Sequence, residues 1–264
     1  MPAMDLVLTV AQSKRLIAEG VVRTEIVRRA LREGLVVVCK GSTTAYVVEE
    51  LLGEEIRKDG FILGRTLPDS FQAPDGMWKG DRPEAVFRRG TYVPELGLSD
   101  VLDELEAGDV VMKGANALDY RNGLVANLIG HSTGGTMGSI LGYVYGRGAH
   151  LVVPIGLEKV VAGSLTDVAR RLEESHSDRS LPRLWVTPGY IVTEIEALKA
   201  IADVEVEHIS SGGLCGAEGA VWLRVFGDSE QLERIGDVAA QLKGEPSYLE
   251  ACLRALDGGD DHGE

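Results

Sequence analysis

Residues 108–119 read GDVVMKGANALD, residues 127–142 read NLIGHSTGGTMGSILG, and residues 151–159 read LVVPIGLEK. In each piece an apolar run of strand length leads into a turn that contains glycine. Residues 35–40 repeat the pattern, because LVVVC is followed by KGSTT at 40–44. Short valine-rich runs of this kind are typical of strands that are buried on both faces of a parallel sheet. They predict an α/β fold with a mostly parallel, Rossmann-like sheet flanked by helices.

The rest of the chain adds helices and a smaller second unit. Apolar residues recur at helical spacing over residues 9–33, where Gly20 is the expected break, and again near 45–52, 136–145 and 168–174. Residues 61–98 are rich in Pro and Gly and predict a long irregular segment. We expect an α/β ligand-binding domain at residues 1–188, a small C-terminal α+β lobe at 189–256 and a disordered acidic tail at 257–264.

Composition excludes several classes of function. The chain has 27 Lys and Arg against 41 Asp and Glu, so its net charge of −14 argues against nonspecific nucleic-acid binding. Three scattered cysteines form no zinc-binding spacing and suit a reducing compartment. No signal peptide or membrane-spanning apolar stretch is visible. We expect a cytoplasmic protein without metal or cofactor and without nucleic-acid or membrane partners. The irregular segment and the fold family described below favour a homo-oligomer.

Two turns have the composition of an anion-binding site. Ligands of open α/β sheets bind beyond the carboxyl ends of strands, where helix N-termini offer free amides and a partial positive charge. Simple capping by Ser or Thr is the alternative explanation. Two consecutive glycines in the second turn favour close approach of a ligand to the backbone. The residues concerned are Lys40, Gly41, Ser42, Thr43 and Thr44 in the first turn, and Ser132, Thr133, Gly134 and Gly135 in the second.

Four side chains near the strand ends are candidates for catalysis. His131 can donate or accept a proton near neutral pH, or can be a structural hydrogen-bonding residue. Lys113 either balances an anionic substrate or forms a salt bridge with Asp119. Glu158 and its neighbour Lys159 are either an acid–base pair or a surface ion pair. Gly114 and Asn116, which follow Lys113, complete the predicted ligand-binding set.

The order of these motifs resembles that of ribose-5-phosphate isomerase A and of the fold family that it shares with coenzyme A transferases and sugar-phosphate-sensing domains. Residues 40–53, KGSTTAYVVEELLG, are similar to the isomerase's G-T-G-S-T loop and helix, which hold the substrate phosphate. Residues 109–119 are similar to its D-G-A-D-E-x-D segment, and residues 128–135 fall where its L-I-K-G-G-G-G loop would be. The resemblance covers roughly residues 30–160 and implies the fold and an anion-binding loop.

The chain departs from the isomerase pattern at several positions. Lys113 and Asn116 stand at aspartate positions, His131 stands near a lysine position, and no carboxylate lies at residues 137–139, where the glutamate base is expected. The resemblance therefore implies isomerase-like proton transfer on a small phosphorylated or carboxylated metabolite, but not standard ribose-5-phosphate isomerisation. One alternative is a non-catalytic metabolite-sensing or interaction module of the same fold. Another is an acyl-CoA-type transferase with Glu158 as nucleophile.

Overall fold

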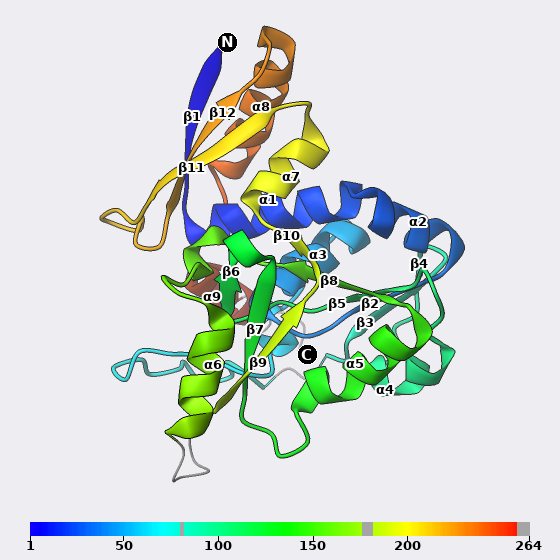
Figure 1. The fold of residues 1–264 in the computed structure, drawn as a ribbon. Coiled ribbons are helices and arrows are strands. Elements are labelled where there is room, and N and C mark those ends of the chain that lie inside the picture. Colours follow the sequence, from blue (N-terminus) through cyan, green and yellow to red (C-terminus); the bar gives the residue numbers. More distant parts are fainter. Residues whose placement is uncertain (80–81, 176–181, 258–264) are drawn as a thin grey trace.

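The computed structural model describes residues 1–79, 82–175 and 182–257. Its largest sheet has six strands in the order β10-β8-β5-β2-β3-β4 (Figure 1). The four parallel strands are β2 (Leu35–Val38), β5 (Val110–Met112), β8 (His150–Pro154) and β10 (Tyr190–Val192). The strands β3 (Ala85–Arg88) and β4 (Thr91–Tyr92) form an antiparallel hairpin at one edge. The predicted α/β class with a mostly parallel sheet is therefore confirmed.

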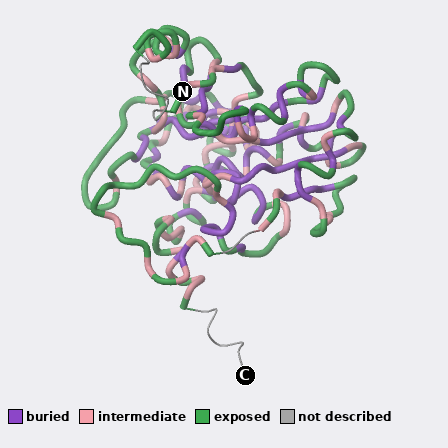
Figure 2. Tube along the Cα trace, turned by 90° about the horizontal axis from the view of Figure 1, so that it is seen from below, coloured by how far each residue is buried: buried purple, intermediate pink, exposed green. Residues whose placement is uncertain are grey.

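The valine run of β2 supplies side chains to both faces of this sheet. Val36 and Val38 belong to a core with α1 (Val10–Arg23), α2 (Glu25–Glu33) and α3 (Ser42–Leu52). Val37 and Cys39 belong to the core on the other face, with α4 (Leu98–Val101) and α5 (Gly135–Arg147). Helices cover both faces, which explains why β2 has no polar alternation. Figure 2 shows these buried segments in purple in the middle of the molecule, with exposed segments around them.

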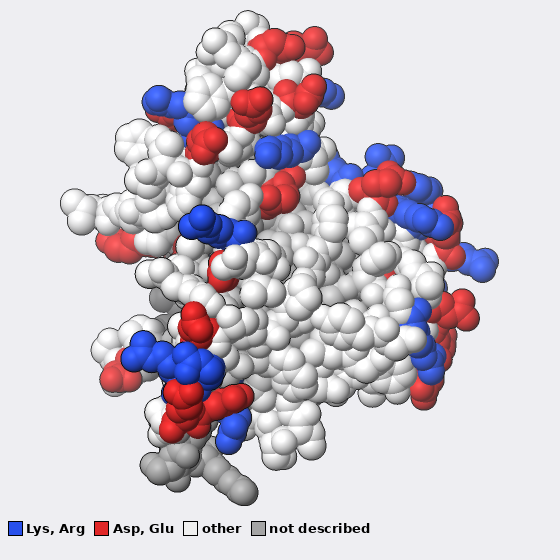
Figure 3. Space-filling view, in the orientation of Figure 1, with Lys and Arg blue, Asp and Glu red and all other residues white. Residues whose placement is uncertain are grey.

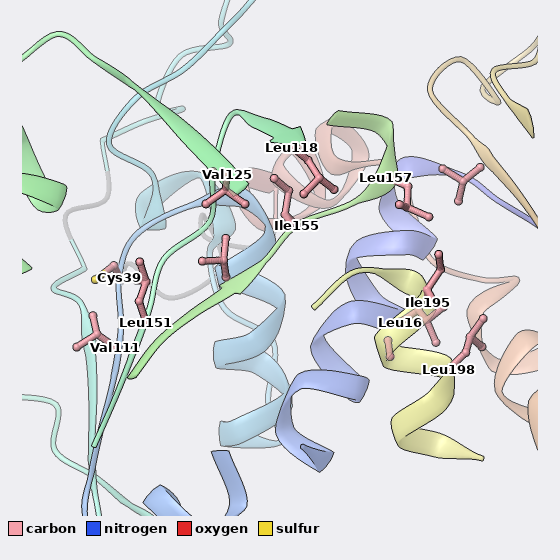
Figure 4. Packing of buried hydrophobic residues seen from close by; sticks show 14 of the residues in the cluster. Leu16, Cys39, Val111, Leu118, Val125, Leu151, Ile155, Leu157, Ile195 and Leu198 are labelled. Atoms are coloured by element: carbon pink, nitrogen blue, oxygen red, sulfur yellow. The ribbon is translucent and has the colours of Figure 1, made fainter. Parts of the chain in front are cut away.

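A second, antiparallel sheet packs over one end of the large sheet. It consists of β6 (Ala117–Asp119), β7 (Leu124–Ile129) and β9 (Arg183–Pro188), and α6 (Leu165–Glu174) lies against β9. Figure 4 shows Leu118 and Val125 beside Ile155, so the core continues from the large sheet into this one. The apolar runs of β7 and β9 thus lie outside the parallel sheet, because an apolar run indicates burial but not which strand it pairs with.

A third sheet joins the two ends of the chain. β1 (Ala3–Leu8) pairs with β12 (Val221–Phe226), which also pairs with β11 (Glu205–Ser211), all antiparallel. Helices α7 (Glu194–Ile201) and α8 (Ser229–Leu242) accompany it (Figure 1). The predicted boundary at residues 188/189 does not coincide with sheet membership, since β1 joins the small sheet and β10 joins the large one.

The remaining elements are a last helix and four short ones. Helix α9 (Tyr248–Asp257) lies in a region where no separate helix is predicted, and residues 258–264 of the predicted tail lie outside the described residues. None of the described helices is long and apolar enough to span a membrane. The 3₁₀ helices are η1 (Lys58–Phe61), η2 (Leu102–Glu104), η3 (Tyr120–Asn122) and η4 (Leu157–Lys159).

Gly20 does not break the first helix. It lies inside α1, and the chain turns at Thr24, between α1 and α2. A Cβ atom on Gly20 would lie 2.3 Å from the Cα atom of Ala197 in α7. The glycine therefore allows close contact between α1 and α7 rather than a change of chain direction.

Candidate functional site

A cleft of about 580 Å³ opens beyond the carboxyl ends of β2 and β5. Its walls are the turns at 40–43 and 113–116, the end of β7 with the loop into α5, residues 63–66, and Lys159. The cleft brings together most of the predicted site residues: Lys40, Gly41, Ser42, Thr43, Lys113, Gly114, Asn116, His131, Gly134 and Gly135. The turns after β2 and β5 converge because parallel strands present their carboxyl ends at the same edge.

The cleft is basic although the chain as a whole is acidic. Its described lining residues include Lys40, Arg65, Lys113 and Lys159, and none of them is Asp or Glu. The net charge of the chain is −14. On the face drawn in Figure 3, basic and acidic side chains are intermixed, for example over α2 at the right, where Arg29 pairs with Glu33. The cleft thus favours an anion locally.

Two helices begin at the cleft without a side-chain cap. Helix α3 has Gly41 as its N-cap and α5 has Gly134, and neither cap residue supplies a side-chain hydrogen bond. The first amides of each helix and its positive dipole end are therefore directed at the cleft. Thr44 does not take part as predicted. It is fully buried, and its hydroxyl donates to the carbonyl oxygen of Gly41 at 3.0 Å, which stabilises the turn.

The two consecutive glycines have a conformational cause. Gly134 and Gly135 have φ angles of +87° and +56°, in the left-handed region that favours glycine. A Cβ atom on Gly134 would also lie 2.5 Å from Cζ3 of Trp185 in β9. Both residues line the cleft, but the backbone conformation and Trp185 explain the pair without the ligand contact that the sequence suggested.

Lys113 and Lys159 lie in the cleft wall with backbone partners alone. The Nζ atom of Lys113 donates to the carbonyl oxygen of Lys40 at 3.3 Å, and that of Lys159 donates to Ala115 at 2.8 Å. Neither ammonium group forms an ion pair with any residue that the structure describes. Burial lowers the pKa of both side chains, and the positive charge of Lys113 further lowers the pKa of Lys159.

His131 stands at the junction of two cavities. Its exposed ring has Nδ1 2.9 Å from Oγ1 of Thr133 and 3.3 Å from the backbone nitrogen of Thr133, whose N–H it accepts. In the neutral ring this leaves the hydrogen on Nε2. Ser132 and Thr133, predicted as ligand-binding residues, line an adjacent cavity of about 1070 Å³ and not the basic cleft. Trp185 lines that cavity too.

Asp119, a predicted proton carrier, lies outside the cleft. Its carboxylate accepts from the backbone N–H and the side-chain amide of Asn122 at the end of η3, and from the N–H of Leu165 at the start of α6. These hydrogen bonds, the one from the Asn122 side chain foremost, lower the pKa of Asp119. The residue therefore holds two chain turns together, and among the described residues it neither lines the cleft nor forms an ion pair with Lys113.

Glu158 belongs to a buried charged cluster behind the cleft. The cluster, as named here, consists of Lys14, Glu158, Lys159 and Glu194, whose charges influence one another. The carboxylate of Glu158 folds back over Gly156, and its Oε2 atom is buried without a hydrogen bond from the described residues. Burial, reinforced by Glu158, raises the pKa of Glu194 to about 7, and burial lowers the pKa of Lys14 to about 8. Only Lys159 extends from this cluster into the cleft lining.

Several cleft residues are absent from the predicted set. Asn127 is buried in β7, and its Nδ2 donates to the carbonyl oxygen of Gly114 at 2.9 Å. The sequence feature that could have indicated Asn127 is its position as a polar residue inside the apolar run LVANLI. Lys159 could have been predicted as a site residue in place of Glu158, since both residues follow the same strand. Arg65 comes from the irregular segment, where no periodicity points to it.

The geometry defines an α/β protein with a basic cleft at the carboxyl ends of its parallel strands. Among the residues at 1–79, 82–175 and 182–257, no group of three His, Cys, Asp or Glu is arranged to hold a metal ion. No family model matches this chain, and no curated protein matches it.

Proposed function

We propose that this protein binds a small phosphorylated or carboxylated metabolite in the basic cleft and catalyses an isomerase-like proton transfer on it. The observation that carries the proposal is the composition of the cleft lining, which has lysine and arginine side chains, two uncapped helix N-termini and no described carboxylate. Such a site attracts anions through charge and through free amides. The resemblance to the isomerase and coenzyme A transferase fold family agrees with the position of the cleft after β2.

The cleft residues divide into an anion site and a proton-transfer site. Ser42 and Thr43 stand at the start of α3, where amides and hydroxyls hold a phosphate or carboxylate, and Lys113 and Lys159 balance its charge. His131 is the candidate that moves protons, because an imidazole ring can both donate and accept a proton and this ring lines the cleft. Without a described carboxylate in the lining, the chemistry differs from the glutamate-dependent isomerisation of ribose 5-phosphate.

Calorimetric titration with inorganic phosphate, sugar phosphates and small carboxylates tests the anion site. We expect binding, and we expect Lys159→Gln to weaken it about 10- to 100-fold, since a hydrogen bond to a charged group contributes about 1.5–3 kcal/mol. Lys243→Gln removes the same charge from an exposed position at the end of α8 and should leave the affinity within about twofold. Absence of binding by every anion, or equal effects of the two variants, would refute the anion site.

A non-catalytic sensor of the same metabolites is the second candidate. The observation in its favour is His131, which is exposed and whose ring contacts Thr133 but no carboxylate of the described residues. Turnover of a bound metabolite that disappears in His131→Ala would exclude the sensor. Acyl transfer through Glu158 gains no support, because that carboxylate lies in the buried charged cluster and not in the cleft lining.

A further inference from the structure

Lys113 occupies an unusual position for a lysine. It directly follows the central strand β5, its side chain is half-buried, and it lines the cleft. Its Nζ atom lies 3.3 Å from the carbonyl oxygen of Lys40, which immediately precedes the N-cap of α3. The amine is therefore held beside the turn that is proposed to bind the anion. A ligand anchored there by an anionic group places its neighbouring atoms next to Lys113.

The surroundings of Lys113 make the neutral amine easier to form than in a solvent-exposed lysine. The titratable groups around it are the Cys39 thiol, Glu84, and Lys159 across the cleft wall. Burial raises the pKa of Cys39 to about 12, so this thiol stays neutral and provides no counter-charge. Glu84 favours the ammonium ion, but burial outweighs it and lowers the pKa of Lys113. Desolvation and a neighbouring cation are the two means by which proteins activate a lysine as a nucleophile.

Lys159 is less suited to the same role. Its ammonium group has the shorter hydrogen bond, 2.8 Å to the carbonyl oxygen of Ala115, and two carboxylates of the buried charged cluster, Glu158 and Glu194, favour its charged form. Lys159 is thus the better counter-charge for the ligand, and Lys113 is the better candidate for a nucleophile.

We propose that Lys113 is a nucleophile that forms an imine with an aldehyde or ketone carrying a phosphate or carboxylate group. The Nζ lone pair attacks the carbonyl carbon, a C–N bond forms, and the carbonyl electron pair moves to oxygen. The amine nitrogen loses one proton and the oxygen gains two, of which the second comes from solvent or from His131, so that water leaves and a protonated imine with a C=N bond forms. The reaction rests on the anion site proposed above, because the anionic group positions the carbonyl. The imine then makes the neighbouring C–H bond more acidic, which suits a proton-transfer site.

Reductive trapping tests this reaction. The intact protein is incubated at pH 7.5 with dihydroxyacetone phosphate or pyruvate and with cyanoborohydride, which donates hydride to the imine carbon and leaves a stable secondary amine. We expect one adduct per chain, located by peptide mass spectrometry on Lys113. Labelling of Lys113 should exceed that of the exposed Lys199 at least tenfold, on the order of the gain from positioning, because the anion site holds the carbonyl beside Lys113. Acetone, which has no anionic group to position it, should label Lys113 far less than dihydroxyacetone phosphate does.

Variants and a competitor separate this reaction from anion binding. Lys113→Arg removes the nucleophilic amine and should abolish the adduct, whereas Lys199→Gln should leave the adduct unchanged. Inorganic phosphate should suppress labelling by dihydroxyacetone phosphate. If phosphate binds but Lys113 is not labelled, or is labelled no more than Lys199, the nucleophile is refuted and the anion site stands. If Lys113 is labelled and no anion binds or competes, the anion site fails instead.

Discussion

Gly20 and Gly142 are both interior residues of helices, but their surroundings are opposite. A Cβ atom on Gly20 would lie 2.3 Å from the backbone of Ala197, whereas one on Gly142 in α5 would meet nothing within 4 Å. Glycine recurs every four residues from Gly134 to Gly146, but no other element packs closely at Gly142. Sequence spacing identifies a face of a helix but not whether another element covers it.

We therefore expect alanine to have opposite effects at these two glycines. Gly20→Ala forces α1 and α7 apart and should lower the free energy of unfolding by about 1–3 kcal/mol. Gly142→Ala should raise it by about 0.5–1 kcal/mol, because alanine loses less backbone entropy in a helix. Urea denaturation of both variants measures this difference. Stabilisation by Gly20→Ala would show that the contact with Ala197 is not tight.

Glu194 predicts a pH dependence of stability. Its pKa in the folded protein is about 7, against about 4.5 when unfolded, so the folded state holds the proton more strongly. Its contribution to stability is complete below about pH 4.5 and is lost as the pH rises to about 7. At about 1.4 kcal/mol per pKa unit the loss is at most about 3 kcal/mol.

The variant Glu194→Gln tests this pH dependence, because glutamine has a similar shape but cannot ionise. Denaturation curves measured between pH 5 and 7 should show that the free energy of unfolding of the wild type falls as the pH rises. The free energy of unfolding of the variant should change less over the same range. Lys14, whose pKa is about 8, titrates above this window. Identical pH profiles for the two proteins would mean that Glu194 does not titrate in this range.

At the scale of elements, β1 is tied to the far end of the chain. Leu6 and Leu8 are buried against the small sheet, while Val7 between them is 53% exposed. Leu8→Ala should lower the free energy of unfolding by about 2–4 kcal/mol, and Val7→Thr by less than about 0.5 kcal/mol. In the Leu8→Ala variant, hydrogen exchange should show reduced protection of the backbone amides of β12, which is the partner of β1. Reduced amide protection in β1 alone would contradict this coupling between β1 and β12.

Elements with a strong local signal were predictable, but their partners were not. Helix α3 covers the segment near residues 45–52 where helical spacing is expected, and β2 lies in the valine run, because periodicity and burial are encoded locally. The pairing of β1 with β12 and of β7 with β9 depends on residues far apart in the chain. A single sequence contains no local signal for such contacts, so the expected division at residues 188/189 missed them.

At the scale of the whole molecule, the interleaved ends predict one cooperative unit. β1 completes the small sheet, β10 completes the large sheet, and α1 packs on both α3 and α7. Calorimetry should therefore show a single unfolding transition, with equal calorimetric and van't Hoff enthalpies. Two separate transitions, one retaining the large sheet, would show that the small sheet unfolds independently.

The sequence by itself determined the α/β class, the strand-end turns and the positions of Lys113 and His131 within them, since apolar periodicity, glycine and turn composition act locally. Only the tertiary structure decided which of these turns meet in one cleft. It placed Asp119 and Glu158 in structural contacts and brought Lys159, Asn127 and Arg65 to the cleft beside Lys113. The physical reason is that strand order and side-chain burial arise from the packing of distant segments, and this packing also sets the charge and the pKa values of the site.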